Sequence, residues 1–442
     1  MLFKDYNLGN ALHNALEDLD ISIPTTIQEK TFSTLMSGKD VLGIAQTGTG
    51  KTYAFLLPVL RLWKFDKSPF PQILIIVPTR ELVAQIVQEV EKLTEYMSVE
   101  VAGVYGGTNI KTHKNAIDRG LDVVVGTPGR LLDLMKDGVL KTKMIKRLII
   151  DEVDEMLNLG FRTQLKEITE FLPQRRQNLM FSATVPEEVK ALIAMFTEQY
   201  TTIEAAPSGA PLININQVAY SVPNFNSKAN LLELMLNTHE EMSKVLVFVS
   251  TKKMADALYE RLLITFEETV GIIHSSKSQN NRFDAVNKFQ AGENRILVTT
   301  DIIARGLDVL EVSHVVNFDL PNEIERYIHR IGRTGRAERM GEAISFISED
   351  ENGLRAEIEK LMDYKIENID LPEGYEASDE LIPLEVVVEH IPYNHKIKEH
   401  KPSGPAFHEK LDKNKKVNNK VRYVDLMKKK YGKPKTRGQK RK

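Results

Sequence analysis

The sequence predicts two doubly wound α/β domains in tandem, each with a parallel sheet covered by helices, followed by a basic tail. Short β-branched apolar runs recur along the chain, and each is followed by a turn signal and a helix-like pattern. The chain has 442 residues, more than one hydrophobic core usually supports. Its net charge of −2 is unevenly distributed, because residues 391–442 hold 18 lysines and arginines against 4 acidic residues.

The strand candidates fall into two groups. The first group is DVLGIA, ILIIVPT, DVVVGTPG, RLIIDE and NLMFSAT, and the second is KVLVFVST, VGIIH, RILVTTD and HVVNFD. Between the groups, TIEAAPSGAPLININQ contains two prolines and a glycine among small residues, which is typical of a linker. We therefore expect a first domain over residues 1–206, a linker over 207–215, a second domain over 216–370 and a C-terminal extension over 371–442.

The composition excludes several classes of protein. The chain contains no cysteine, which excludes disulfides and thiolate metal sites but leaves oxygen ligands for hard cations. No apolar run approaches the roughly 18 residues of a membrane span, and the N-terminal MLFKDYNLGN lacks the layout of a secretory signal. A cytoplasmic protein is therefore expected.

The end of the C-terminal extension is rich in lysine and asparagine and poor in aromatic residues. Such a tail cannot bury enough apolar surface to fold alone, so it is predicted to be disordered. Its charge favours polyanions. A solubilising tail is the alternative, but the rest of the chain favours attachment to nucleic acid.

The stretch AQTGTGKT, residues 45–52, is predicted to bind the phosphates of a nucleotide. It lies between an apolar strand and an apolar helix, so backbone amides and a helix N-terminus would face the phosphates. Gly48 and Gly50 permit the tight turn, Lys51 would reach the β and γ oxygens, and the Thr52 hydroxyl would bind magnesium. Ala45 stands where the usual spacing has glycine, which is acceptable if the backbone there is not left-handed.

Two acidic residues at the end of a later strand complete a predicted triphosphatase site. RLIIDEVDEM carries Asp151 and Glu152 directly after the apolar run. Asp151 would hold the metal through water, and Glu152 would orient and deprotonate the water that attacks the γ-phosphate. Acidic residues at the end of a strand are weak evidence for a site on their own. Together with Lys51 in the same half of the chain, they indicate a nucleoside triphosphatase.

A cluster of arginines in the second half is predicted to complete this site. In YIHRIGRTGRAERM, Arg330, Arg333 and Arg336 follow at three-residue spacing, with Gly332 and Gly335 between them. Neighbouring cations repel unless an anion neutralises them, and the triphosphate held by the first half is the natural anion. Arg333 and Arg336 would then act as arginine fingers, so hydrolysis would depend on domain closure. A solvated basic helix end is the alternative, but it would not need two glycines.

With these residues placed, residues 1–370 closely resemble the DEAD-box RNA helicases of superfamily 2, which are ATP-dependent enzymes with two RecA-like domains, here of the bacterial type. The alanine in AQTGTGKT is the family's own version of the loop. The other motifs occur in the family's order: Phe3 and IPTTIQ, PTREL at residues 78–82, Gly106 and Gly107, TPGR at 127–130, DEVD at 151–154, SAT at 182–184, VFVST near Phe248, Gln279 with Arg282, TTDIIARGLD at 299–308 and HRIGRTGR at 329–336.

The resemblance implies roles for further residues. Gln28 reads the adenine, Phe3 stacks on the base and Asp308 touches the ribose. The rest of the nucleotide site is the phosphate loop, Ala45, Gln46, Thr47, Gly48, Thr49, Gly50, Lys51 and Thr52. Hydrolysis is coupled to RNA opening through Asp154, Ser182, Thr184 and His329. The RNA-binding candidates are Pro78, Thr79, Arg80, Gly107, Thr127, Gly129, Arg130, Gln279, Arg282 and Thr300.

These RNA-binding candidates offer mostly backbone amides, hydroxyls and arginines at turns after parallel strands. Such groups suit phosphates and sugars more than bases, which predicts little sequence preference. Each of them alone can also be interpreted as a strand-end cap or a surface residue.

The chain departs from the family pattern at two places. Val153 replaces the alanine that names the family, and we expect it to pack without harm because Asp151, Glu152 and Asp154 remain. Ser275 and Ser276 stand where the family usually has glycine and an acid, which affects the loop before Gln279.

The predicted function is an ATP- and Mg²⁺-dependent RNA helicase whose RNA-stimulated hydrolysis drives domain closure and the local, non-processive opening of short duplexes, or the remodelling of RNA–protein complexes. It is expected to act as a monomer on RNA, away from membranes, with ribosomal or RNA-decay proteins as candidate partners. A DNA helicase or translocase is one alternative, against which Gln28 and Phe3 argue. An RNA-annealing or scaffold protein without turnover is another, against which Lys51, Glu152 and the arginine fingers argue.

Overall fold

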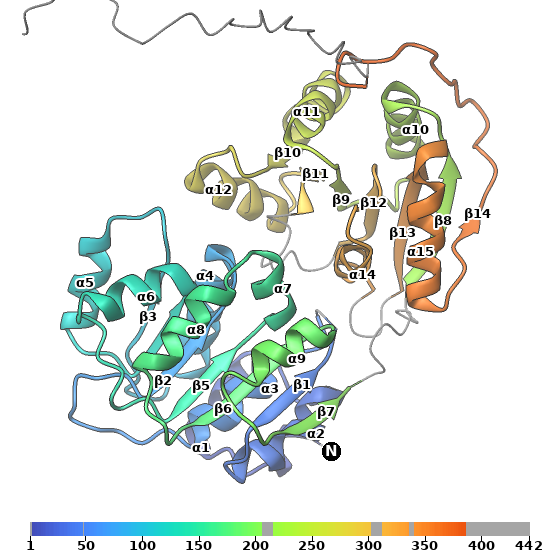
Figure 1. Cartoon of the computed structure of the whole chain (residues 1–442). Coiled ribbons are helices and arrows are strands. Elements are labelled where there is room, and N and C mark those ends of the chain that lie inside the picture. The colour runs from blue at the N-terminus through green and yellow to red at the C-terminus, as the bar shows by residue number, and fades with distance from the viewer. Residues whose placement is uncertain (1, 47, 206–214, 302–311, 336–339, 386–442) are drawn as a thin grey trace, which may run out of the picture. The chain divides into compact units, whose positions relative to one another are not determined.

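The computed structural model describes residues 2–46, 48–205, 215–301, 312–335 and 340–385 (Figure 1). Thr47, Asp308, Arg336 and the basic tail lie outside these ranges. Two sheets of seven parallel strands, each flanked by helices, confirm the predicted fold class. We call residues 2–205 the first lobe and residues 215–385 the second lobe.

The first sheet has the strand order β3-β4-β2-β5-β6-β1-β7. Successive residues of a strand face opposite sides of the sheet, so both sides need apolar side chains when helices cover both. In β2, Ile73 and Ile75 enter one core while Leu74 and Ile76 enter the other. The strands are β1 (Val41–Ile44), β2 (Ile73–Ile76), β3 (Val101–Val104), β4 (Val123–Gly126), β5 (Arg147–Ile150), β6 (Gln177–Ser182) and β7 (Thr201–Glu204).

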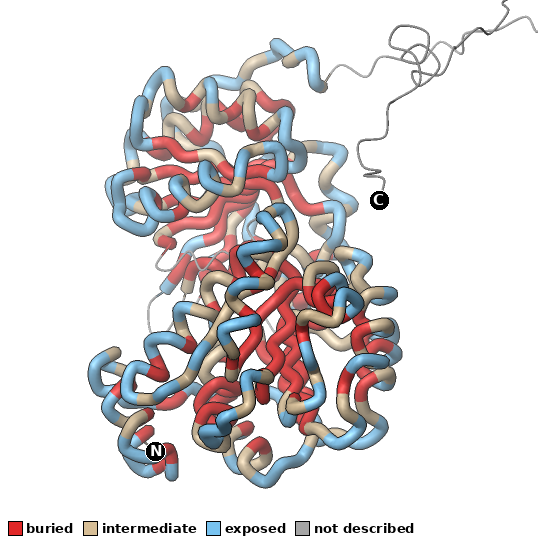
Figure 2. Tube along the Cα trace, turned by 90° about the vertical axis from the view of Figure 1, so that its left-hand side faces the viewer, coloured by how far each residue is buried: buried red, intermediate tan, exposed pale blue. Residues whose placement is uncertain are grey.

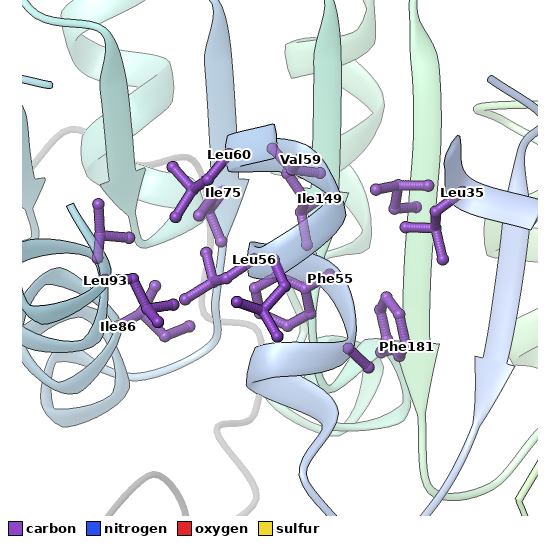
Figure 3. Close-up of a cluster of buried hydrophobic side chains, with 14 of the residues drawn as sticks. Leu35, Phe55, Leu56, Val59, Leu60, Ile75, Ile86, Leu93, Ile149 and Phe181 are labelled. Carbon is purple, nitrogen blue, oxygen red and sulfur yellow. The ribbon is translucent and has the colours of Figure 1, made fainter. Parts of the chain in front are cut away.

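Helix α3 (Lys51–Arg61) follows the phosphate loop and is buried along most of its length. Figure 3 shows Phe55 and Leu56 of this helix packed among side chains of the sheet and of α4, which anchors the loop to the core. The other helical segments of the first lobe are η1 (Phe3–Asp5), α1 (Asn10–Asp18), α2 (Thr26–Met36), α4 (Arg80–Leu93), α5 (Ile110–Asp118), α6 (Pro128–Lys136), α7 (Val153–Asn158), α8 (Arg162–Phe171) and α9 (Glu187–Ile193).

The second sheet has the order β10-β11-β9-β12-β13-β8-β14, which repeats the order of the first sheet strand for strand. Its first strand in the chain begins at Ile215, the last residue of the predicted linker. The strands are β8 (Ile215–Ser221), β9 (Val245–Phe248), β10 (Val270–Ile273), β11 (Ile296–Thr299), β12 (His314–Asn317), β13 (Gly341–Ile347) and β14 (Glu367–Asn368). The helical segments are α10 (Phe225–Thr238), α11 (Lys252–Phe266), η2 (Glu267–Thr269), α12 (Gln279–Gln290), α14 (Glu325–Ile331), η3 (Glu349–Glu351) and α15 (Asn352–Met362).

Residues 371–385, which we call the strap, run along α10. Asn226 and Asn230 each donate from the side-chain amide to a strap carbonyl at 2.8 Å. Tyr375 and Ile382 of the strap pack against the core between the second sheet and its helices. This part of the predicted C-terminal extension therefore belongs to the folded second lobe.

Burial follows the expected pattern, with buried strands at the centre of each lobe and exposed outer helix faces (Figure 2). Within the described ranges, no helix combines the length and the apolarity that crossing a bilayer requires.

Candidate nucleotide site and nucleic-acid interface

The predicted phosphate loop lies between β1 and α3, with a backbone that glycine makes possible. Gly48 and Gly50 have φ angles of +83° and +88°. A Cβ atom on Gly50 would lie 2.5 Å from the Gln28 side-chain nitrogen, so no larger residue fits there. The backbone at Ala45 is not left-handed, and its amide donates to Ser182 O at 3.1 Å. A small residue therefore suffices at the loop entry, as the sequence indicates.

Gln28 ties the N-terminal segment to this loop. Its Oε1 accepts the Thr25 amide at 2.8 Å, and its Nε2 donates to Gly50 O at 3.0 Å. Phe3, the predicted stacking residue, is only 3% exposed, and its ring lies 5.7 Å from that of Tyr6. Gln28 thus contacts the loop directly, whereas Phe3 is buried against Tyr6 in the N-terminal segment.

Lys51 at the start of α3 comes together with Asp151 and Glu152, which directly follow β5. Lys51 and Asp151 are 7% and 3% exposed. Lys51 Nζ and Glu152 Oε2 are buried without a hydrogen-bond partner among the described residues. Burial raises the pKa of both carboxyls, and the nearby Lys51 charge opposes this shift. An ammonium and a carboxylate left with open bonding positions are suited to a charged ligand and its water.

Glu152 adopts a left-handed backbone conformation, with φ of +53° and ψ of +54°, at the start of α7. Such a conformation is strained for a residue with a Cβ and persists only when the surroundings enforce it. Val153, the next residue, is 1% exposed and packs in the apolar core of the first lobe, as expected. The buried valine therefore anchors the helix start that sets the direction of Glu152.

Asp154 is the centre of a hydrogen-bond network that joins DEVD to SAT. Its Oδ2 accepts the Thr184 amide at 2.9 Å and the Thr184 hydroxyl at 3.0 Å. Its own amide donates to the Ser182 hydroxyl at 3.2 Å. From the second lobe, His329 Nε2 lies 4.0 Å from the same Oδ2. The four predicted coupling residues are thus in one place.

Arg333 also reaches this place from the second lobe. It lines one small cavity together with Lys51, Glu152, Asp154, Glu155, Ala183 and His329. The Arg333 charge is among those that lower the pKa of Glu152, although burial outweighs it. The cavity thus contains an ammonium, a guanidinium and carboxylates, which is the charge pattern that a metal-bound triphosphate requires.

The interpretation that one anion neutralises all three arginines is wrong for Arg330. Its guanidinium donates to both carboxylate oxygens of Asp301, with the NH2 bond at 2.8 Å, and to Asp319 O at 2.6 Å. It is 2% exposed and stacks 4.9 Å from the centroid of Phe248. An internal carboxylate neutralises Arg330, because its place on α14 points it into the core of its own lobe.

The RNA-binding candidates of the first lobe lie after β2, β3 and β4, which are neighbours in the sheet. Thr79 caps α4 through its hydroxyl, which accepts the Leu82 amide at 3.2 Å, and Thr127 precedes α6. Gly107 has a φ of +81°, and a Cβ there would lie 2.3 Å from the Arg80 guanidinium. Arg130 is bonded to His113 and to Thr108 O. Pro78 is buried and Gly129 has open space beside it.

The candidates of the second lobe are Gln279, Arg282 and Thr300. Gln279 Nε2 donates to Glu81 Oε1 of the first lobe at 3.0 Å, and Arg282 NH1 pairs with the same oxygen at 3.0 Å. Thr300, directly after β11, is 6% exposed. Despite Ser275 and Ser276, the loop before α12 closes through the Lys277 amide, which donates to His274 O at 3.0 Å.

Glu81 was not singled out by the sequence analysis, although it lies within PTREL. A buried ion-pair group, in which Lys228 contacts Asp319 at 3.1 Å and Glu351 at 2.8 Å, was also not predicted. The amide of Ser250, in VFVST, donates to Asp319 Oδ2 at 2.9 Å. The sequence offered only the presence of an acidic residue inside a motif as a signal for these contacts. The residues that pair with each other lie far apart in the sequence, so the pairing itself could not be predicted.

Comparison with known proteins assigns the chain to a class. Residues 25–192 match the family model described as DEAD/DEAH box helicase, and residues 227–338 match the helicase conserved C-terminal domain. The chain belongs to the DEAD/DEAH box helicase family.

Two relatives match most of the chain. It is 36% identical over 380 residues to the ATP-dependent RNA helicase DbpA of Bacillus subtilis, covering 85% of this chain and 78% of that protein. It is 39% identical over 370 residues to the RNA helicase CrhR of Synechocystis, covering 84% of this chain and 74% of that protein.

Solved structures agree with this assignment. Saccharomyces cerevisiae Dbp5 bound to RNA and ADP BeF3 superposes with a TM-score of 0.76 at 30% identity, covering 83% of this chain and 95% of that one. Mss116p bound to single-stranded RNA and AMP-PNP has a TM-score of 0.75 at 29% identity, covering 83% and 78%.

Proposed function

We propose that this ATP-dependent RNA helicase works as a clamp that ATP and RNA close together. The observation that carries the proposal is the cavity at Asp154. There Lys51 and Glu152 have buried atoms that find no hydrogen-bond partner in the described part of the chain, and Arg333 arrives from the other lobe. A γ-phosphate and its attacking water would supply the missing partners. Because both lobes contribute charges, turnover depends on their closure.

Lys51 binds the β- and γ-phosphates, and the amides of Gly48 and Gly50 face them. Thr52 and Asp151 are suited to hold Mg²⁺, because hydroxyl and carboxylate oxygens are the donors that this cation prefers. When bound, Mg²⁺ neutralises charge on the phosphate oxygens. In the domain arrangement we propose, residues 1–206 provide this site and residues 216–370 complete it.

Glu152 orients the attacking water and accepts its proton, which its strained position and open oxygen favour. Arg333 and Arg336 stabilise the charge that develops on the transferred phosphoryl group. Gln28 and Phe3 position the adenine and Asp308 the ribose. Asp154 transmits the state of the site, because it bonds the SAT segment and lies near His329.

RNA binds along the ends of β2, β3 and β4 and across to α12. Threonine hydroxyls, loop amides and arginines contact phosphates and sugars there, so little base preference follows. Closing on a bent strand opens a short duplex locally, without processive translocation. We further propose that the protein acts as a monomer in the cytoplasm, with ribosomal or RNA-decay proteins as additional partners.

Two substitutions test the clamp. Lys51→Ala should lose ATP binding, because the ammonium that faces the β- and γ-phosphates is gone. Glu152→Gln should bind ATP and RNA but reduce turnover about 100-fold or more, because the general base is removed. The measurements are binding of a fluorescent ATP analogue and ATPase rates with and without single-stranded RNA. Full RNA-stimulated turnover in either variant would defeat the assignment.

A further inference from the structure

Arg130 and His113 form a side-chain pair in the first lobe. His113 lies on α5, and Arg130 lies in the first turn of α6. The Arg130 guanidinium donates from NH1 to His113 Nδ1 at 2.7 Å and from NH2 to Thr108 O at 3.1 Å. Two acceptors, both in the segment between β3 and the middle of α5, therefore hold one guanidinium.

The hydrogen bonds define the protonation state of His113. A guanidinium only donates, so Nδ1 must accept and carries no proton. The ring proton of the neutral imidazole then lies on Nε2, which is 3.3 Å from the Thr108 hydroxyl oxygen. That hydroxyl in turn lies 3.1 Å from Tyr105 O, to which it donates. Each donor in this chain has an acceptor only while His113 is neutral.

The surroundings of the imidazole also favour the neutral form. His113 is 6% exposed, and the Tyr105 ring packs edge-on at 5.7 Å. Burial, and then the Arg130 charge, lower the pKa of His113 from its usual range. The ionisable groups on the elements around the ring are Lys111, Lys114 and Asp118 on α5, Arg130, Asp133 and Lys136 on α6, and Tyr105 after β3. Of these, Lys114 pairs with Asp137 at 2.9 Å.

We infer that His113 is a positioning residue, which in its neutral form holds Arg130 in place for an RNA phosphate and on protonation releases it. A protonated ring offers Arg130 no acceptor and places a second positive charge beside it. The inference rests on the proposed RNA contact of Arg130. It makes RNA affinity depend on pH through one side chain.

His113→Gln and His113→Ala separate this role from simple packing. The glutamine supplies an acceptor that does not titrate, whereas alanine supplies none. In wild-type protein, the KM for an oligouridylate in the ATPase assay should rise as the pH falls from about 8 to about 5.5. His113→Gln should keep the wild-type KM at pH 8 and lose most of this rise. His113→Ala should raise the KM roughly tenfold at pH 8 while kcat changes less than about twofold.

A matched control is His239→Gln, which replaces an exposed histidine bonded to Glu241 at 2.8 Å and should keep the wild-type pH profile. A wild-type pH profile in His113→Gln would overturn the inference, as would an unchanged KM in His113→Ala. A thermal unfolding curve for each variant shows whether it is folded. If His113→Ala is unfolded, the pH profile of His113→Gln alone tests the inference.

Arg130→Ala distinguishes a failure of this inference from a failure of the proposed RNA contact. If Arg130→Ala raises the KM for RNA and His113→Ala does not, only the positioning role is wrong. If Arg130→Ala leaves the KM unchanged, the RNA contact itself is wrong, and the inference is overturned together with that part of the proposed function.

Discussion

At the residue scale, Glu152 combines a left-handed backbone with a carboxylate oxygen that is buried without a partner among the described residues. Each feature costs stability in the absence of ligand, by about 1–3 kcal/mol for the backbone alone. Strain of this kind persists where a site requires a fixed direction for one side chain. The cost is thus consistent with the proposed role as general base.

Glu152→Gln should therefore raise the melting temperature of the ligand-free protein at neutral pH. A gain of about 1 kcal/mol in the free energy of unfolding corresponds to about 2 °C. The neutral amide avoids the burial of a charge. Burial raises the pKa of Glu152, so the cost of the charge develops as the pH rises above about 4.3, the unfolded value, towards the folded pKa. The stability difference between wild type and variant should therefore be smaller at pH 5 than at pH 8. Calorimetry at both pH values measures this, and equal differences would argue against a buried charge.

Much of the candidate site could be predicted because its residues follow strands within short motifs. Lys51 and Asp151 are examples, since a strand end and a helix start determine where they point. The acceptors that orient other residues could not be predicted. His113 and Asp301 lie 17 and 29 residues from their arginine partners and outside the helices that carry these arginines, so only tertiary packing brings each pair together.

At the scale of elements, the nine apolar runs correspond to strands, whereas β3, β7, β8, β13 and β14 were not predicted. For β7, β8, β13 and β14 the physical reason is the lack of a continuous apolar run, whereas β3 is a short run of small apolar residues, VAGV, at the sheet edge. Three of the four residues of β7 are exposed, because it is an edge strand. β8 has exposed polar residues at Asn216 and Ser221 and starts within the predicted linker. β14 has only two residues.

The strap provides a prediction at this scale. A chain ending after Asp370 should lose about 2 kcal/mol of stability in the second lobe, because Tyr375 and Ile382 no longer cover the apolar core. A chain ending after Glu385 is the matched control and should unfold like the full-length chain. Scanning calorimetry compares the three. Equal melting temperatures for the two truncated chains would show that the strap does not contribute to stability.

At the scale of the whole molecule, the folded lobes and the basic tail are expected to bind RNA in different ways. The lobes offer arranged hydroxyls, amides and single arginines, whereas residues 391–442 offer 18 positive charges with little apolar content. Contacts of the second kind depend on the release of counterions and therefore on salt.

A chain ending at residue 390 should bind RNA more weakly at low salt, and the slope of log affinity against log salt should decrease by about 0.7 for each lost phosphate contact. Fluorescence anisotropy with a single-stranded RNA at several salt concentrations measures both quantities. The KM for ATP at saturating RNA serves as the control and should not change. An unchanged slope would refute the assignment of the tail to RNA binding.

The repeated strand order allows equivalent places in the two lobes to be compared. After β1, the glycine-rich loop leads into the start of α3, whose amides we propose to face the phosphates. After β8, the corresponding start of α10 receives an internal anion, because Glu385 Oε1 of the strap accepts the Phe225 amide at 2.6 Å. The helix start of the second lobe is thus satisfied by the chain itself, which supports the proposal of a single nucleotide site in the first lobe.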